Sequence, residues 1–184
     1  MAIFFKIVLQ SNFQKFISPL TKKIFRFQAM DGFVEVLTAL QNPDNNIRNQ
    51  AEKSYESTNL GTKVDYLTQI LCSDCPDEIV LIACIYLRKL LSNSDLISGF
   101  KENPSQFNEF KRKIIEIVKR HAFKQNLQQK LASLLCDTFM LESNDWKESE
   151  ELLLELNSQQ ATLPVALYWN CFSITESYEP LFKN

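Results

Sequence analysis

The sequence predicts an all-α protein, an α-solenoid of about four HEAT-type helix hairpins that form an armadillo-like, alpha-alpha superhelix. Apolar residues recur at helical spacing almost throughout from Asp31 onward, while prolines and helix-capping residues separate the stretches. The first helices of successive hairpins are expected near residues 31, 62, 104 and 145, which gives spacings of about 31, 42 and 41 residues. The last two spacings match the ~40–47-residue period of HEAT and armadillo repeats. A closed, irregular helical bundle is the alternative.

The first hairpin is predicted from two apolar stripes and the turn between them. Its first helix carries apolar residues at i, i+3, i+4 and i+7, namely Phe33, Val36, Leu37 and Leu40. The turn at residues 42–45 ends that helix, and Asn45 or Asn46 is expected to cap the next one. The second helix runs to about Ser57, with an i, i+4, i+8 stripe of Ile47, Ala51 and Tyr55.

A second hairpin follows a short turn that contains Gly61. Its first helix carries the apolar residues Val64, Leu67, Ile70 and Leu71. Residues 73–76 then break the chain, and the next helix is expected over about Asp77–Leu91. That helix is apolar on nearly every face between Ile79 and Leu87, so we expect it to be buried on more than one side. Residues 92–103, with Gly99, are expected to form a loop.

The third and fourth hairpins complete the predicted array. Pro104 opens a helix whose apolar face consists of Phe107, Phe110, Ile114, Ile117 and Val118. The helix after it is expected from about Gln125 to Leu141. Asn144 or Asp145 is expected to cap a seventh helix. Thr162 is expected to cap an eighth helix that has Pro164 at its first position and reaches about Glu176.

The opening segment differs in composition from the rest, so residues 1–29 are assigned outside the fold and residues 30–184 to the repeat array. Residues 1–30 carry five basic and no acidic side chains, which leaves 15 (20 − 5) basic and 22 acidic, a balance of −7. No nucleic-acid binding is expected, because neutralising phosphates requires a basic surface. The segment is interpreted as a gene-model extension upstream of Met30, a targeting or membrane-surface helix, or a signal peptide. No stretch approaches ~18 consecutive apolar residues, so no stable membrane insertion is expected.

The residue inventory predicts neither an enzyme nor a cofactor or metal site. Three glycines leave no dinucleotide fingerprint, P-loop or nucleophile elbow, and the single histidine, His121, excludes a multi-histidine site. Cys72 and Cys75 form one C-x-x-C, but further zinc ligands at matching spacing and a preceding strand are missing. A structural role is therefore favoured over metal or redox chemistry. The remaining cysteines are interpreted as buried, reduced thiols: Cys84, Cys136 and Cys171.

Three stretches of the chain together carry a family resemblance. The run LQNPDNNIRNQAEKSYES contains Leu40, Pro43, Asp44, Arg48, Ala51, Glu52 and Tyr55. This run resembles the first repeat of the importin-β family of nuclear transport receptors, and the run IACIYLRKLL, at Ile82–Leu91, resembles the second helix of the second repeat. The run TKVDYLTQIL, at Thr62–Leu71, also fits, and the closest branch is the importin-five (karyopherin beta-three) branch. The resemblance is strong over residues 31–91, weaker but in register over 104–175, and absent over 1–29.

The resemblance implies a protein that binds the Ran GTPase in its GTP state and takes part in protein import, in cytoplasm and nucleus. In the family, second helices of the first repeats contact the switch region of Ran, which maps here to Asn46–Ser57 and Asp77–Leu91. The residues carried over are Arg48, Glu52, Tyr86, Lys89 and Asn93. Simpler interpretations are a core position for Tyr86 and solvated or helix-end charges for Arg48 and Lys89.

The resemblance also implies partners beyond Ran. Cargo proteins and nucleoporins are expected to bind repeats that this chain lacks, because members of the family are much longer. The chain is accordingly expected to be a fragment, an incomplete gene model or a truncated paralogue. The alternative function is a Ran-independent α-solenoid adaptor that binds its partners whatever the nucleotide state.

Overall fold

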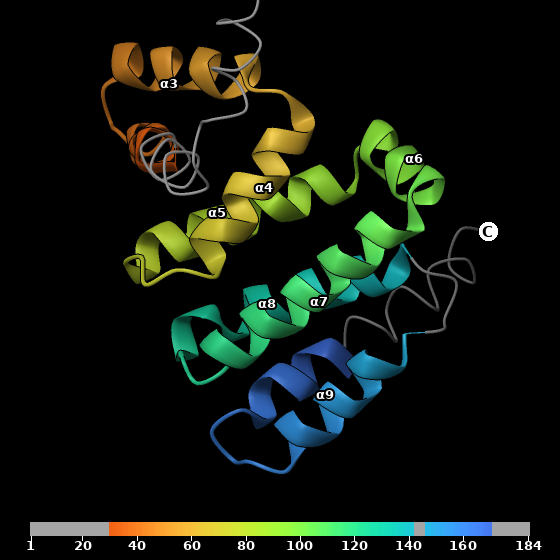
Figure 1. Ribbon diagram of the computed structural model, residues 1–184. Coiled ribbons are helices and arrows are strands. Elements are labelled where there is room, and N and C mark those ends of the chain that lie inside the picture. The colour runs from red at the N-terminus through yellow and green to blue at the C-terminus, as the bar shows by residue number, and fades with distance from the viewer. Residues whose placement is uncertain (1–29, 142–145, 171–184) are drawn as a thin grey trace, which may run out of the picture. The chain divides into compact units, whose positions relative to one another are not determined.

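The computed structural model describes residues 30–141 and 146–170, and within these ranges the regular structure is entirely helical (Figure 1). The chain divides between Tyr55 and Glu56 into two compact units, which are described separately. This all-helical architecture confirms the predicted fold class. The part of the predicted eighth helix beyond residue 170, to about Glu176, and the predicted caps at Asn144 and Asp145 lie outside the described residues.

The first unit contains a helix over residues 30–39 and most of α3 (Asn45–Ser57). Phe33 and Leu37 are buried on the first helix, and the ring of Phe33 lies 5.9 Å from that of Tyr55 on α3. The cap of α3 is Asp44, one residue earlier than predicted, because its Oδ1 accepts a hydrogen bond from the backbone N of Asn46 at 2.7 Å. The predicted first hairpin is thus present, but Ile47 of the predicted α3 stripe is 42% exposed.

The second unit begins with a hairpin of α4 (Leu60–Leu71) and α5 (Asp77–Leu91). Asn59 caps α4 by accepting from the backbone N of Thr62 at 2.8 Å, so α4 starts two residues before the predicted 62. The predicted bounds of α5 are confirmed, and so is its burial on several sides, because α5 packs against α4, α6 and α8. Its buried side chains are Ile79, Val80, Ala83, Cys84, Leu87 and Leu91.

A short helix, α6 (Ser94–Glu102), replaces the loop predicted over residues 92–103. Asn93 caps α6, since its Oδ1 accepts from the backbone N of Asp95 at 2.9 Å and of Leu96 at 3.1 Å. Phe100 is buried, and its ring centroid lies 4.9 Å from that of Phe107 on the next helix. Aromatic burial of this kind stabilises a nine-residue helix despite Gly99.

The rest of the second unit consists of two further hairpins. The first pairs α7 (Pro104–His121) with α8 (Gln125–Met140), and the second pairs α9 (Lys147–Asn157) with a helix over residues 163–170. The helix at 163 starts one residue before Pro164, which was predicted at the first position. The hydroxyl of Thr162, the predicted cap, donates to the carbonyl oxygens of Leu156 at 2.8 Å and Gln159 at 3.2 Å. The Thr162 side chain therefore stabilises the turn between α9 and the helix that starts at residue 163.

The hairpins of the second unit stack in two layers (Figure 1). First helices contact first helices, with α4 against α7 and α7 against α9, while α5 contacts α8 in the other layer. The ring of Phe139 on α8 lies 5.6 Å from that of Trp169, which extends the layer of second helices to residues 163–170. Because each hairpin packs on its sequence neighbour through like-positioned helices, the unit has the arrangement of an α-solenoid.

Candidate functional site

Two of the carried-over residues, Arg48 and Glu52, lie on α3 in the first unit. Arg48 is half-buried, and its guanidinium donates to the carbonyl oxygen of Asn42 at 3.4 Å and to Oδ1 of Asn45. Arg48 thus holds the turn that precedes α3. Glu52 lies one turn further along α3 and is exposed. Of these two side chains, Glu52 is the one open to a partner.

Tyr86 and Lys89 meet on the last turns of α5. Tyr86 is half-buried, and the ammonium of Lys89 lies 5.1 Å from the centroid of its ring. This is the geometry of a cation–π contact, which orients the lysine stem along the helix. Lys89 is exposed and has no carboxylate within ion-pair distance in the described part of the chain. Lys89 therefore offers an exposed positive charge whose position is supported by the Tyr86 ring.

Asn93, the fifth carried-over residue, is half-buried just beyond α5. Its side-chain oxygen is occupied by the cap of α6. This local role accounts for an asparagine at that position without a partner protein.

A hollow of about 490 Å³ lies beside Lys89, between α5 and α8. Side chains of both helices line it: Ile85, Arg88, Lys89, Leu91, Ser92, Asp137, Met140 and Leu141. An ion pair spans the two helices here, with Nε of Arg88 2.6 Å from Oδ2 of Asp137. Met140 is 52% exposed, so the hollow combines a cationic edge with accessible apolar surface. Surfaces that combine charge with accessible apolar groups in this way can receive a protein side chain.

Sequence reasoning missed Arg88, Asp137 and Met140 as members of this site. The signal that could have found the Arg88–Asp137 contact is the register between successive second helices. Since α8 begins 48 residues after α5 (125 − 77), position 88 on α5 corresponds to position 136 on α8, next to Asp137. Corresponding positions of two second helices lie near each other when the hairpins stack. The pairing cannot be read from either helix alone.

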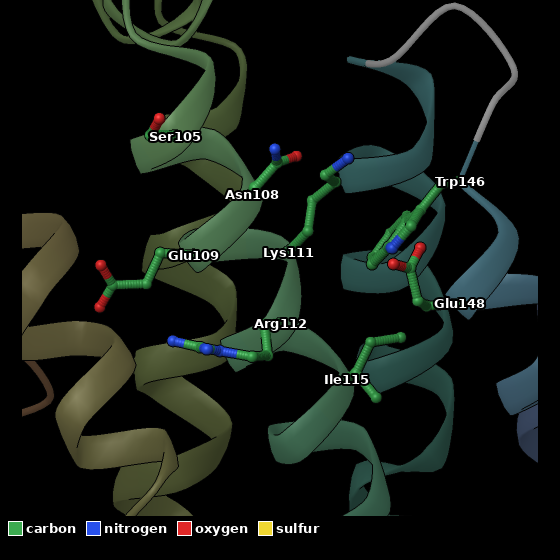
Figure 2. A pocket seen from close by; sticks show the side chains of 8 residues that line it. All are labelled: Ser105, Asn108, Glu109, Lys111, Arg112, Ile115, Trp146 and Glu148. Atoms are coloured by element: carbon green, nitrogen blue, oxygen red, sulfur yellow. The ribbon is translucent and has the colours of Figure 1, made fainter.

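A second hollow, of about 690 Å³, lies in the layer of first helices, between α7 and the start of α9 (Figure 2). Its lining residues are Ser105, Asn108, Glu109, Lys111, Arg112, Ile115, Trp146 and Glu148. Figure 2 shows α7 as one wall and Trp146 with Glu148 as the other. Lys111 is buried between them, with its ammonium 5.2 Å from the ring of Phe107 and 6.0 Å from that of Trp146. The exposed rim is polar and bears both signs of charge.

The cysteines have the features of structural residues. Cys84 and Cys136 are buried, as predicted, and Cys171 lies outside the described residues. Burial raises the pKa of the Cys84 thiol to about 12 and also raises that of Cys72, so both are protonated at neutral pH. In the C-x-x-C, the hydroxyl of Ser73 donates to Sγ of Cys75 at 3.1 Å. Within residues 30–141 and 146–170, three or more histidine, cysteine or acidic side chains nowhere gather as a metal site requires.

Comparison with protein-family models, with curated proteins and with solved structures gives no match to this chain. Over the described ranges, no helix is both long enough and apolar enough to cross a bilayer.

Proposed function

We propose that this chain is the N-terminal part of a nuclear transport receptor, one that binds Ran in its GTP state and takes part in protein import into the nucleus. The observation that supports it is the exposed Lys89 on α5, whose ammonium lies over the Tyr86 ring and which lines the hollow that α5 shares with α8. The resemblance assigns Ran binding to second helices, and α5 is a second helix on which Lys89 has no ion pair among the described residues. The proposed localisation of the protein is the cytoplasm and the nucleus.

The mechanism is a matter of selective binding. The switch loops of a GTPase are ordered by the γ-phosphate and its magnesium ion and are released on hydrolysis. A rigid surface that fits only the ordered form therefore converts hydrolysis into release. The stacked layers supply that rigidity, because α5 is held by α4, α6 and α8. In this proposal, cargo proteins and nucleoporins bind at surfaces other than the one around Lys89.

A Ran-independent adaptor is the second candidate function. The observation that favours it is the larger hollow between α7 and α9, which lies in the layer of first helices and does not involve α5. An adaptor of this kind holds a partner through that hollow whatever the nucleotide state of any GTPase.

A titration of the full chain separates the two candidates. Ran loaded with a non-hydrolysable GTP analogue is titrated by calorimetry, with Ran–GDP in parallel. The receptor proposal predicts an affinity for the GTP form at least tenfold higher than for the GDP form, which is a difference of about 1.4 kcal/mol. Equal binding to both forms, or binding to neither by protein with the helical circular dichroism of a folded chain, contradicts it.

A further inference from the structure

The α4–α5 turn and the α7–α8 turn are fastened together by polar contacts. Nε2 of His121 lies 2.7 Å from the carbonyl oxygen of Leu71, the last residue of α4. On one side of it, the guanidinium of Arg120 lies 2.5 Å from Asp74, and on the other the ammonium of Lys124 lies 2.6 Å from Asp77. These three contacts, each linking residues 46 to 50 positions apart, are called the turn joint below.

His121 is at the centre of the turn joint and is only 2% exposed. The carbonyl of Leu71 is a free acceptor of a helix C-terminus, so Nε2 must carry the proton and donate to it. Nδ1 of the same ring is buried and has no hydrogen-bond partner among the described residues. Neutral imidazole tolerates this, because a bare lone pair at Nδ1 needs no acceptor. Imidazolium does not, because it places a buried N–H there with nothing to receive it.

The charged groups around the ring act in both directions, and the two basic ones, Lys124 and Arg120, disfavour the imidazolium. Asp74, in the α4–α5 turn, is paired with Arg120 near the end of α7. Asp77, at the start of α5, is paired with Lys124 in the α7–α8 turn. The thiol of Cys72 follows α4 and is protonated. Burial lowers the pKa of His121, and Lys124 and Arg120 lower it further, while the Leu71 contact and Asp77 act in the opposite direction.

We infer that the turn joint is an acid-sensitive junction: protonation of His121 at Nδ1 forces the ring out of its site and uncouples the α4–α5 hairpin from the α7–α8 hairpin. The inference rests on contacts within the chain and is independent of any partner. Its sign follows from linkage. The folded state holds the proton less tightly than the unfolded chain does, so coupling is complete above the ordinary histidine pKa of 6.5 and falls as the pH drops below it.

Titration of the imidazole by NMR tests the inference directly, because His121 is the single histidine of the sequence and its ring signals need no assignment by mutation. In the full chain, we expect a midpoint below 6.5. We also expect amide shifts over residues 71–77 and 120–124 that follow the same curve. A midpoint at or above 6.5, or a titration that leaves those amides unmoved, overturns the inference.

Labelling of Cys84 reports whether the hairpins separate. This thiol is buried on α5 and lies 3.4 Å from the carbonyl oxygen of Lys130 on α8. A pyridyl disulfide, which reacts in mild acid, is used with site-resolved mass spectrometry, and the urea-unfolded chain at each pH supplies the reference rate. Relative labelling should rise as the pH falls from 7.5 to 5, by up to about tenfold per pH unit.

His121→Gln is the matched variant, because its side-chain nitrogen can still donate to Leu71 but does not titrate. We expect its Cys84 labelling to stay flat over the same range. Equal acid dependence in the wild type and in His121→Gln contradicts the inference. If the variant does not fold, as shown by far-ultraviolet circular dichroism, the NMR titration of the wild type decides alone.

Discussion

Arg88 on α5 and Asp137 on α8 join two successive hairpins, with Nε of Arg88 2.6 Å from Oδ2 of Asp137. Both side chains are about one-third exposed, at 33% and 34%. The pair borders the α5–α8 hollow, and its sequence neighbour Lys89 lines the same hollow without an ion pair in the described part of the chain. The contact that joins the two hairpins therefore lies next to the candidate binding surface around Lys89.

The Arg88–Asp137 pair should contribute little to stability. A double-mutant cycle with Arg88→Ala and Asp137→Ala is expected to give a coupling free energy of about 0.2–1 kcal/mol, because solvent screens a pair this exposed. Urea unfolding at low and high salt measures it, and the coupling should shrink at high salt. A coupling above about 2 kcal/mol would show that the pair is far better shielded than its exposure indicates.

Packing of α5 should contribute much more. Leu87 is fully buried on α5, and Leu87→Ala is expected to lower the free energy of unfolding by about 2–5 kcal/mol through lost burial and a residual cavity. Leu154 on α9 is 73% exposed, so Leu154→Ala is the matched control and should cost less than about 0.5 kcal/mol. Urea denaturation followed by circular dichroism measures both. Similar costs for the two variants would contradict the observed packing of α5.

Asn93 should behave as a helix cap. Asn93→Ala is expected to destabilise the chain by about 0.5–2 kcal/mol, because the N–H groups of Asp95 and Leu96 lose their acceptor. Asn93→Asp keeps an acceptor and should remain close to wild type. Thermal unfolding of the two variants checks this. An Asn93→Ala variant with unchanged stability but impaired Ran binding would restore Asn93 to the binding surface.

Asp77 should account for part of the loss of stability of the folded chain at low pH. Its hydrogen bond from Lys124 holds the pKa of the Asp77 carboxyl below its ordinary value of 3.8. The folded state therefore releases this proton more readily, so the contribution is present above 3.8 and is lost as the pH falls through the lowered pKa. Asp77→Asn should flatten the fall in melting temperature below about pH 4. An acid limb identical to wild type would argue against the Lys124 contact.

The fold was largely predictable because the hairpins are local in sequence. Stripes such as the one through Leu67 and Leu71 specify helices, and Pro104 specifies a start, so the bounds of α5 and the start of α7 emerge directly. The helix α6 was missed because Gly99 and its short length weaken the local signal. Its stability comes from the contact of Phe100 with Phe107, which is known only after packing.

The candidate site was less predictable than the fold. The adjacency of Tyr86 and Lys89 follows from their three-residue spacing on one helix. By contrast, the pairing of Arg88 with Asp137 depends on the register between hairpins, and the capping by Asn93 depends on a helix that the pattern did not predict. Spacing within a helix is encoded locally, whereas contacts between repeats are not.

The most direct test of the central claim, that α5 presents a binding surface for Ran in its GTP state, is a charge reversal in the Ran titration. Lys89→Glu is compared with Arg112→Glu, an exposed arginine on α7 that is also without an ion pair in the described ranges. We predict that Lys89→Glu weakens binding of the GTP form by roughly tenfold or more, while Arg112→Glu stays within about twofold of wild type. Unchanged affinity in Lys89→Glu, with the fold intact by circular dichroism, would contradict the claim.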